Sequence, residues 1–229
     1  MRKPLAWIAV SAAAGLGLYA VTRWGYRVTT TTRDVPHVPD GPLEDVPEPA
    51  GRPDVQEESD GHGARFHRRY SVAVEGSVLE AEPLMAEITS GIQSFVPDEV
   101  ARFEKTVGVA GSLSVGDEYH IHISSPWDGP VRVAEVTPTS FTLVTLEGHL
   151  EAGQIRFSAT DLEDGSLQFM IESWARSRDA VVDVVYDDLG LAKQVQQGMW
   201  TFFCNRVVEV SGGERIGDIE VVTEREDHA

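Results

Sequence analysis

The chain has 229 residues, 41% of them hydrophobic, and 37 acidic against 19 basic residues give a formal net charge of −18. This length allows one full-sized domain with extensions. The acidic balance argues against nucleic acid as a partner, because phosphate binding needs clustered Lys and Arg. The single cysteine, Cys204, excludes an intramolecular disulfide and a cysteine-based zinc site, and its apolar helical context predicts a buried thiol.

Residues 1–33 predict a membrane anchor followed by a basic flank. The uncharged run from Leu5 to Val21 reaches the lower limit of about 17–25 residues for a spanning helix, and Trp24 and Tyr26 follow it as interfacial aromatics. Basic residues directly after the run favour a single-pass anchor over the alternative, a cleaved signal peptide. Basic residues on both sides leave the orientation open, and the absence of disulfides leans toward a cytoplasmic C-terminal domain.

Two further segments have the composition of flexible chain. Residues 34–65 hold six of the 12 prolines and nine acidic residues, so they predict a disordered, self-repelling linker. The acidic segment 212–229 predicts a flexible tail. The folded domain is therefore expected at residues 66–211.

Within residues 66–211 the hydrophobic period changes twice. Alternating residues predict a strand at 68–75, helical spacing predicts two short helices at 78–91 and 97–107, and a long helix is expected from Asp179 to Val210. Between the short and long helices the period is two, which predicts five further strands at 119–123, 131–136, 140–146, 154–159 and 167–173. This order predicts an α+β helix-grip domain, a curved antiparallel sheet of about six strands with the long C-terminal helix covering one face.

Two motifs carry a family resemblance over about residues 68–209. The first is Gly148-His149-x-x-Ala152-Gly153-x-x-Arg156-Phe157, and the second is Ser173-Trp174-Ala175-Arg176-Ser177. Together they resemble a plant and bacterial family of domains of unknown function, number 1990. In the second motif, Ala175 and Ser177 stand where that family commonly has Ser and Pro. The element order also resembles the START and Bet v 1-like superfamily, which implies a cavity for apolar ligands between sheet and helix.

The same motifs supply the candidate site residues. His149, Glu151 and Arg156 are expected as a polar cluster at one end of the sheet, either structural or in contact with a ligand. Arg176 is expected where the last strand meets the long helix, in a carboxylate–guanidinium pair or at a ligand head group. Trp174 and Trp200 are expected in the core or in the cavity wall.

A metal site is not expected, although His120 and His122 project to one face of a strand, because the sequence shows no third ligand. No cofactor motif is present either. The leading hypothesis for function is noncatalytic binding of an apolar or amphipathic, lipid-like small molecule by a membrane-anchored domain. The alternatives are a cyclase- or hydratase-type enzyme that uses His149 and Glu151, and a membrane-displayed protein-interaction module.

Overall fold

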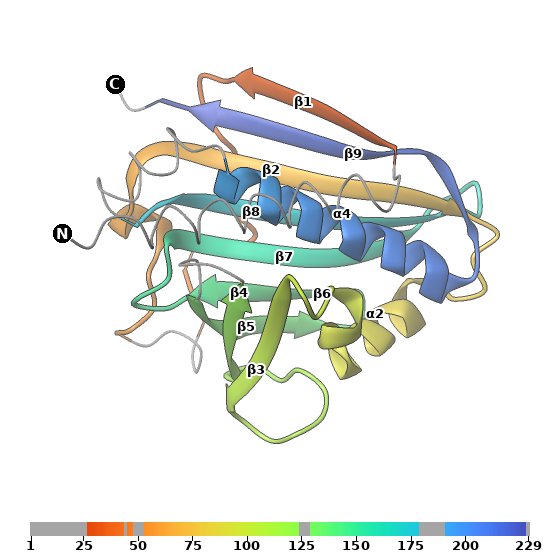
Figure 1. Cartoon of the computed structure of the whole chain (residues 1–229), viewed down its shortest axis with the longest axis horizontal. Helices are drawn as coiled ribbons and strands as arrows, with labels where there is room; N and C mark the ends of the chain where they lie inside the picture. The colour runs from red at the N-terminus through yellow and green to blue at the C-terminus, as the bar shows by residue number, and fades with distance from the viewer. Residues whose placement is uncertain (1–26, 44, 48–52, 124–128, 179–190, 228–229) are drawn as a thin grey trace.

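The computed structural model describes residues 27–43, 45–47, 53–123, 129–178 and 191–227, which form one sheet with the strand order β1-β9-β2-β8-β7-β6-β5-β4-β3. The strands are β1 Val28–Asp34, β2 His62–Glu75, β3 Ala101–Val107, β4 Glu118–Ile123, β5 Gly129–Thr137, β6 Ser140–Thr145, β7 Glu151–Asp161, β8 Leu167–Ser177 and β9 Glu214–Glu226. The helices are α2 Ala81–Ser90 and α4 Leu191–Ser211, with 3-10 turns η1 Glu58–Asp60 and η2 Ile92–Phe95. The α+β helix-grip class is confirmed, because the sheet curves and α4 lies across one of its faces (Figure 1).

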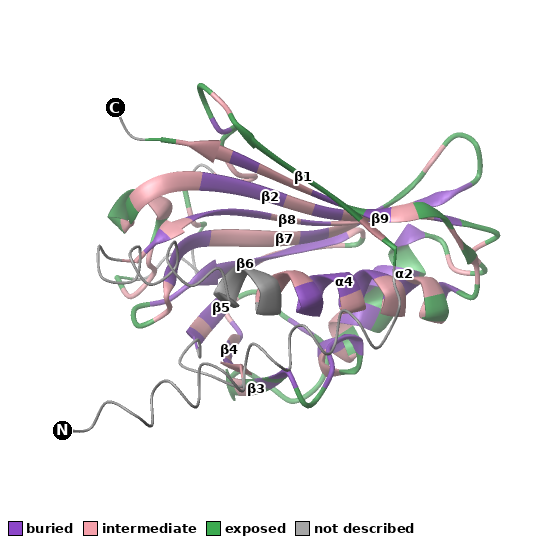
Figure 2. Ribbon diagram, turned by 45° about the horizontal axis from the view of Figure 1, so that its top comes forward, coloured by how far each residue is buried: buried purple, intermediate pink, exposed green. Residues whose placement is uncertain are grey.

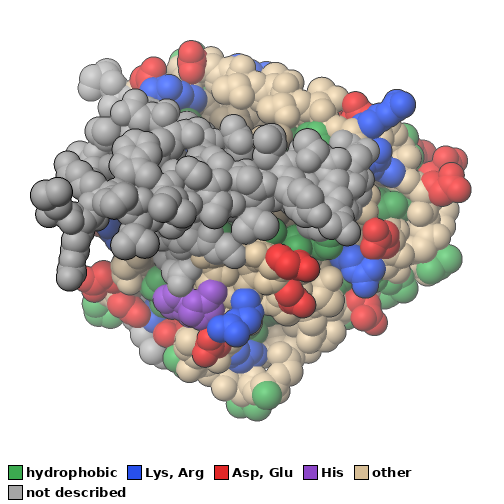
Figure 3. Space-filling model, in the orientation of Figure 1, with side chains coloured by type: hydrophobic (Ala, Val, Ile, Leu, Met, Phe, Trp, Pro, Cys, Tyr) green, Lys and Arg blue, Asp and Glu red, His purple; other side chains and the backbone are tan. Residues whose placement is uncertain are grey.

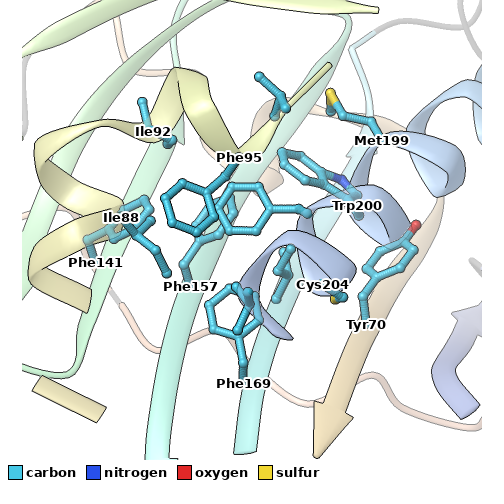
Figure 4. Packing of buried hydrophobic residues seen from close by; sticks show 14 of the residues in the cluster. Tyr70, Ile88, Ile92, Phe95, Phe141, Phe157, Phe169, Met199, Trp200 and Cys204 are labelled. Carbon is cyan, nitrogen blue, oxygen red and sulfur yellow. The ribbon is translucent and has the colours of Figure 1, made fainter. Parts of the chain in front are cut away.

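Helix α4 closes the core by burying one apolar side. Phe203 is fully buried, stacks on Phe95 with ring centroids 5.2 Å apart, and packs on Phe157 at 5.3 Å. Figure 4 shows Phe95 and Phe157 in one cluster with Trp200 and Cys204. Each buried side chain of this size contributes about 1.5–3 kcal/mol. The expected buried thiol is found beside it, since Cys204 is fully buried and burial raises the pKa of its thiol. The predicted long helix is thus confirmed from Leu191 onward, and residues 179–190 lie outside the described part of the chain.

The second predicted short helix, 97–107, is wrong. The segment that follows Val100 forms strand β3, which pairs antiparallel with β4 at one edge of the sheet. The spacing of Val100, Phe103 and Val107 imitates a helical face, but Val107 is 43% exposed. From Ala101 to Glu104, buried and exposed residues alternate, with Ala101 and Phe103 buried. That alternation is the period of a strand.

The described residues form a sheet of nine strands, not about six, because β3 takes the place of the second predicted helix and both flanks of the predicted domain join the sheet. Strand β1 lies in the segment interpreted as basic flank, and β9 lies in the segment interpreted as a flexible tail. Strand β1 pairs parallel with β9, so the sheet is mixed rather than wholly antiparallel. Strand β1 could not be predicted from the sequence, because it carries no alternating apolar pattern. Its residues are nearly all exposed (Figure 2). The predicted domain limits of 66–211 are therefore too narrow.

The acidic segment before β2 also departs from the predicted disordered linker. Val38 is fully buried, and Val55 forms a β-bridge with Leu146. A small apolar cluster joins this segment to the face of the sheet opposite α4, and its members are Leu43, Val46, Val55, Ala134 and Val144. Few apolar residues are needed here, because the sheet supplies the other half of the contact.

No helix in the described residues is both long and apolar enough to cross a bilayer. The predicted anchor, Leu5 to Val21, lies outside those residues.

Candidate functional site

The register of β7 and β8 divides the six candidate residues between the two faces of the sheet. Glu151 lies on the face that α4 covers, called here the concave face, and Trp200 reaches the same space from α4. Side chains alternate between the two faces along a strand. The opposite, convex face therefore carries Arg156 of β7, and Trp174 and Arg176 of β8, because each is an odd number of positions from the residues of its strand that face α4. The expected cluster of His149, Glu151 and Arg156 therefore does not exist as one group.

A cavity of about 90 Å³ lies on the concave face between the sheet and α4, beside the hairpin that joins β6 to β7. Its walls are mainly apolar, and its polar lining gathers where the hairpin meets α4. The apolar lining residues are Ile121, Ile123, Leu143, Leu150, Ile155, Ala175, Met199 and Trp200. The lining residues with polar side chains on the concave face are Thr145, His149, Glu151, Ser173 and Gln196. Gln154 also borders the cavity, but its side chain donates to the carbonyl of Leu43 on the opposite face.

The glycine-histidine motif builds the hairpin at the polar end of this cavity. The backbone N–H of Glu151 donates to Nδ1 of His149 at 3.0 Å, which folds the imidazole back onto its own turn. The ring is half-buried, and loss of hydration lowers the pKa of His149 despite the opposing effect of the Glu151 charge. Gly153 permits a close strand approach, since a Cβ there would lie 2.0 Å from the carbonyl oxygen of Trp174. Gly153 and His149 of the motif are thus explained by the structure of the hairpin.

Glu151 is the charged group of the cavity lining. Its Oε1 accepts a hydrogen bond from Nη1 of Arg68 at 3.0 Å, and its Oε2 accepts one from Nε2 of Gln196 at 3.2 Å. Arg68 is only 5% exposed and Glu151 only 8%, so the pair is held in the protein interior. This buried carboxylate–guanidinium pair resembles the one expected near Arg176, but different residues form it. Arg68 and Gln196 were both missed as site residues.

The Gln196 side chain leaves one polar atom without a partner. Its nitrogen must face Glu151, because an ionised carboxylate only accepts hydrogen bonds. Its oxygen, Oε1, is then buried, and among the described residues it has no hydrogen-bond partner. Gln196 is one of the residues that line the cavity, so this acceptor lies within the cavity wall.

A residue of the supposed linker fixes the hairpin. Nε2 of Gln56 donates to the carbonyl oxygen of Glu151 at 2.8 Å and to that of His149 at 3.1 Å. The backbone of Gln56 also donates to the carbonyl of Thr145 at 2.8 Å. The polar end of the cavity is therefore held in place by a segment that sequence reasoning assigned to flexible chain.

The convex-face candidates form a separate polar layer. Trp174 stacks on His67 with ring centroids 4.7 Å apart, and His67 lies between Glu224 at 3.0 Å and Glu172 at 3.3 Å. Arg156 donates to Oγ of Ser140 at 3.3 Å. Arg176 donates to the carbonyl of Gly63 at 3.1 Å. The sheet separates these residues from the cavity.

His120 and His122 lie on one face of β4, as their spacing predicts, with ring centroids 4.6 Å apart. Nε2 of His122 lies 3.0 Å from a carboxylate oxygen of Glu104. Figure 3 shows a histidine group at the surface beside acidic and basic side chains. Within the described ranges, no group of three or more potential metal ligands occurs.

Comparison with known families adds one assignment. A family model described as a domain of unknown function, DUF1990, matches residues 61–213. The chain belongs to this family. A comparison with curated proteins finds no match.

Solved structures resemble this DUF1990 chain only distantly. The Zhui aromatase/cyclase from Streptomyces sp. R1128 has a TM-score of 0.47 at 15% identity, covering 65% of this chain and 94% of that one. A hypothetical protein from Helicobacter pylori has a TM-score of 0.46 at 8% identity, covering 62% and 86%. Norcoclaurine synthase from Thalictrum flavum has a TM-score of 0.44 at 11% identity, covering 67% and 91%. At these values the likenesses carry no argument about function.

Proposed function

We propose that this domain binds a small apolar or amphipathic molecule in the cavity between the sheet and α4. The observation that carries the proposal is the distribution of polarity in the cavity, whose apolar walls end at one buried polar group of Glu151 and Gln196. Binding sites for small molecules are typically apolar with a few placed polar groups. An amphipathic ligand would place its polar end at the hairpin and its apolar part against Trp200 and Met199.

The size of the cavity limits the ligand. A volume of about 90 Å³ is smaller than the ~150 Å³ of an engineered cavity that binds benzene. It is also below the ~300–1,000 Å³ of sites for drug-sized ligands. The enclosed part of the ligand is therefore only a few atoms in size, unless the helix and sheet separate on binding.

Catalysis by His149 and Glu151 has less support. Both carboxylate oxygens of Glu151 already accept hydrogen bonds, from Arg68 and from Gln196. Nδ1 of His149 is held by the backbone of Glu151, so one ring nitrogen serves the turn. This arrangement supports roles in positioning and recognition over roles as a free acid and base. The two alternative hypotheses, a cyclase- or hydratase-type enzyme and a protein-interaction module, both predict a protein that retains no small molecule.

Membrane attachment is the second part of the proposal. The uncharged run from Leu5 to Val21, with basic residues on both sides, supports a single-pass anchor. A lipid-like ligand would then be available in the adjacent bilayer. Fusing a protease site after residue 27 and fractionating membranes before and after cleavage tests the anchor independently of ligand binding.

The binding proposal is tested by native mass spectrometry of the full chain purified from its own host. We expect a small molecule retained in stoichiometric amount by the wild type. Ala175→Leu should expel it, because Ala175 is buried in the cavity wall and a larger side chain would fill the space. Ala73→Leu is the matched control, since Ala73 lies on the convex face of β2. Retention of the molecule by Ala175→Leu, or none in the wild type, would overturn the proposal.

A further inference from the structure

We infer that the ligand of this cavity enters with an uncharged hydrogen-bond donor, a hydroxyl or a carboxamide, which binds Oε1 of Gln196. This inference deepens the proposed function and rests on it. It follows from Oε1 of Gln196, which is buried and without a partner among the described residues. Oε1 of Gln154 also has no partner there, but the Gln154 side chain lies on the convex face, where its Nε2 donates to the carbonyl of Leu43. Buried polar atoms are nearly always hydrogen-bonded, so a ligand donor accounts for this acceptor.

The identity of the unpaired Gln196 atom is fixed by its neighbour Glu151. If the Gln196 amide were turned around, its oxygen would face Oε2 of Glu151 at 3.2 Å, and two acceptors would oppose each other. The nitrogen therefore donates to Glu151, whose other carboxylate oxygen accepts from Arg68. The cavity presents an oxygen, which selects a donor in the ligand.

An anionic head group does not fit this end of the cavity. The charged side chain among the described lining residues is Glu151, whose carboxylate would repel a second anion. The guanidinium of Arg68 lies nearby, but it already forms an ion pair with Glu151. The imidazole of His149 is neutral near pH 7, because burial lowers its pKa. A carboxylate or phosphate would thus lose its hydration without gaining a counter-charge from the described lining residues.

Three small probes of equal chain size separate the possibilities: 1-butanol, its isomer diethyl ether and butyrate. The alcohol has a donor, the ether has the same atoms but only an acceptor, and butyrate is an anion. All three have four carbons, so they differ mainly in the polar group that they can place in a cavity of about 90 Å³. The full chain is titrated with each probe while two-dimensional proton–nitrogen NMR follows backbone amides and the side-chain amide of Gln196.

We expect 1-butanol to bind about fivefold more tightly than diethyl ether, the effect of one neutral hydrogen bond, and butyrate to bind most weakly. Equal affinity for alcohol and ether, or tighter binding of butyrate, would overturn the inference while leaving the proposed function intact. If no probe shifts the resonances of cavity residues, both the inference and the proposed function fail.

A variant assigns the effect to Gln196. Gln196→Met keeps the length of the side chain and removes its oxygen, so the preference for alcohol over ether should disappear. Gln197→Met is the control, because this neighbouring glutamine bonds Thr30 at 3.3 Å outside the cavity. Preserved alcohol selectivity in Gln196→Met contradicts the assignment. Should that variant not fold, the comparison of the three probes on the wild type still decides the ligand class.

Discussion

The guanidinium of Arg68 donates a hydrogen bond of 3.0 Å to the carboxylate of Glu151 inside the protein. The two residues are 83 positions apart, on β2 and β7, with strand β8 between them. The pair therefore crosses a neighbouring strand and fixes the polar end of the cavity. Attraction within such a pair is largely offset by lost hydration, so its main effect is geometric.

Removal of one partner of the Arg68–Glu151 pair should strongly destabilise the folded protein. We expect Arg68→Met to lower the free energy of unfolding by about 3–5 kcal/mol, because Glu151 would remain charged and buried without its cation. The neighbouring substitution Arg69→Met is the control, since Arg69 is 34% exposed and its ion pair with Glu224 is longer, at 3.6 Å. Chemical denaturation of the full chain measures both. Equal effects would show that Arg68 has no special structural role.

The hairpin should depend on Gln56. Gln56→Ala removes two donors to the carbonyls of His149 and Glu151, which should cost about 0.5–1.5 kcal/mol per bond. Hydrogen exchange of residues 146–153 should become faster, since the hairpin loses its anchor. Gln197→Ala removes a single exposed bond and serves as the comparison. Unchanged exchange in the hairpin would contradict the anchoring role.

Gly129 should be essential for the position of the His149 ring. A Cβ at residue 129 would lie 2.0 Å from Cδ2 of His149, which is too close for any real contact. Gly129→Ala should therefore displace the ring and destabilise the protein by about 1–3 kcal/mol. Gly91→Ala, where the nearest atom is 3.7 Å away, should be tolerated. A crystal structure of Gly129→Ala with the ring unmoved would refute this explanation.

Part of the site was predictable from strand parity alone. Arg156 is five residues from Glu151 on one strand, so the two side chains must lie on opposite faces. Arg68 shares the parity of Tyr70 and Val72 in an alternating strand, which indicates an inward-facing cation. These signals were present in the sequence, whereas the grouping of His149, Glu151 and Arg156 followed closeness along the chain.

The failure to predict β1, β9 and the ordered contacts of Gln56 has a different cause. Strand β1 is almost fully exposed, and β9 is rich in charge, so neither shows the full alternation of a buried strand. Their stability comes from pairing with neighbours far along the chain, as between Thr31 and Val222. The bonds of Gln56 to residues more than 90 positions away are likewise invisible in local composition. Long-range pairing of this kind leaves little local signal.

Acid should weaken the attachment of β1 and β9 through Glu224. A hydrogen bond from Arg33, supported by one from His67, lowers the pKa of Glu224 below its ordinary value of 4.5. A lowered carboxyl pKa gives stability that is complete above 4.5 and lost as the pH falls below it. Glu224→Gln should therefore melt at a lower temperature at pH 7, and the difference should shrink below pH 4.5. Glu220→Gln, an exposed change on the same strand, should show no such trend.

His149 should make the protein sensitive to mildly acidic conditions. Loss of hydration lowers the pKa of His149 below its ordinary value of 6.5, although Glu151 opposes the shift and Arg178 and His120 add to it. The unfolded chain then takes up a proton that the folded chain resists, so stability is complete above pH 6.5 and falls as the pH drops below it. His149→Asn, whose side-chain oxygen can still accept from the turn, should flatten this loss between pH 6.5 and 5. The measurement is a series of thermal melts across that range. An unchanged slope in His149→Asn would mean that other groups cause the acid sensitivity.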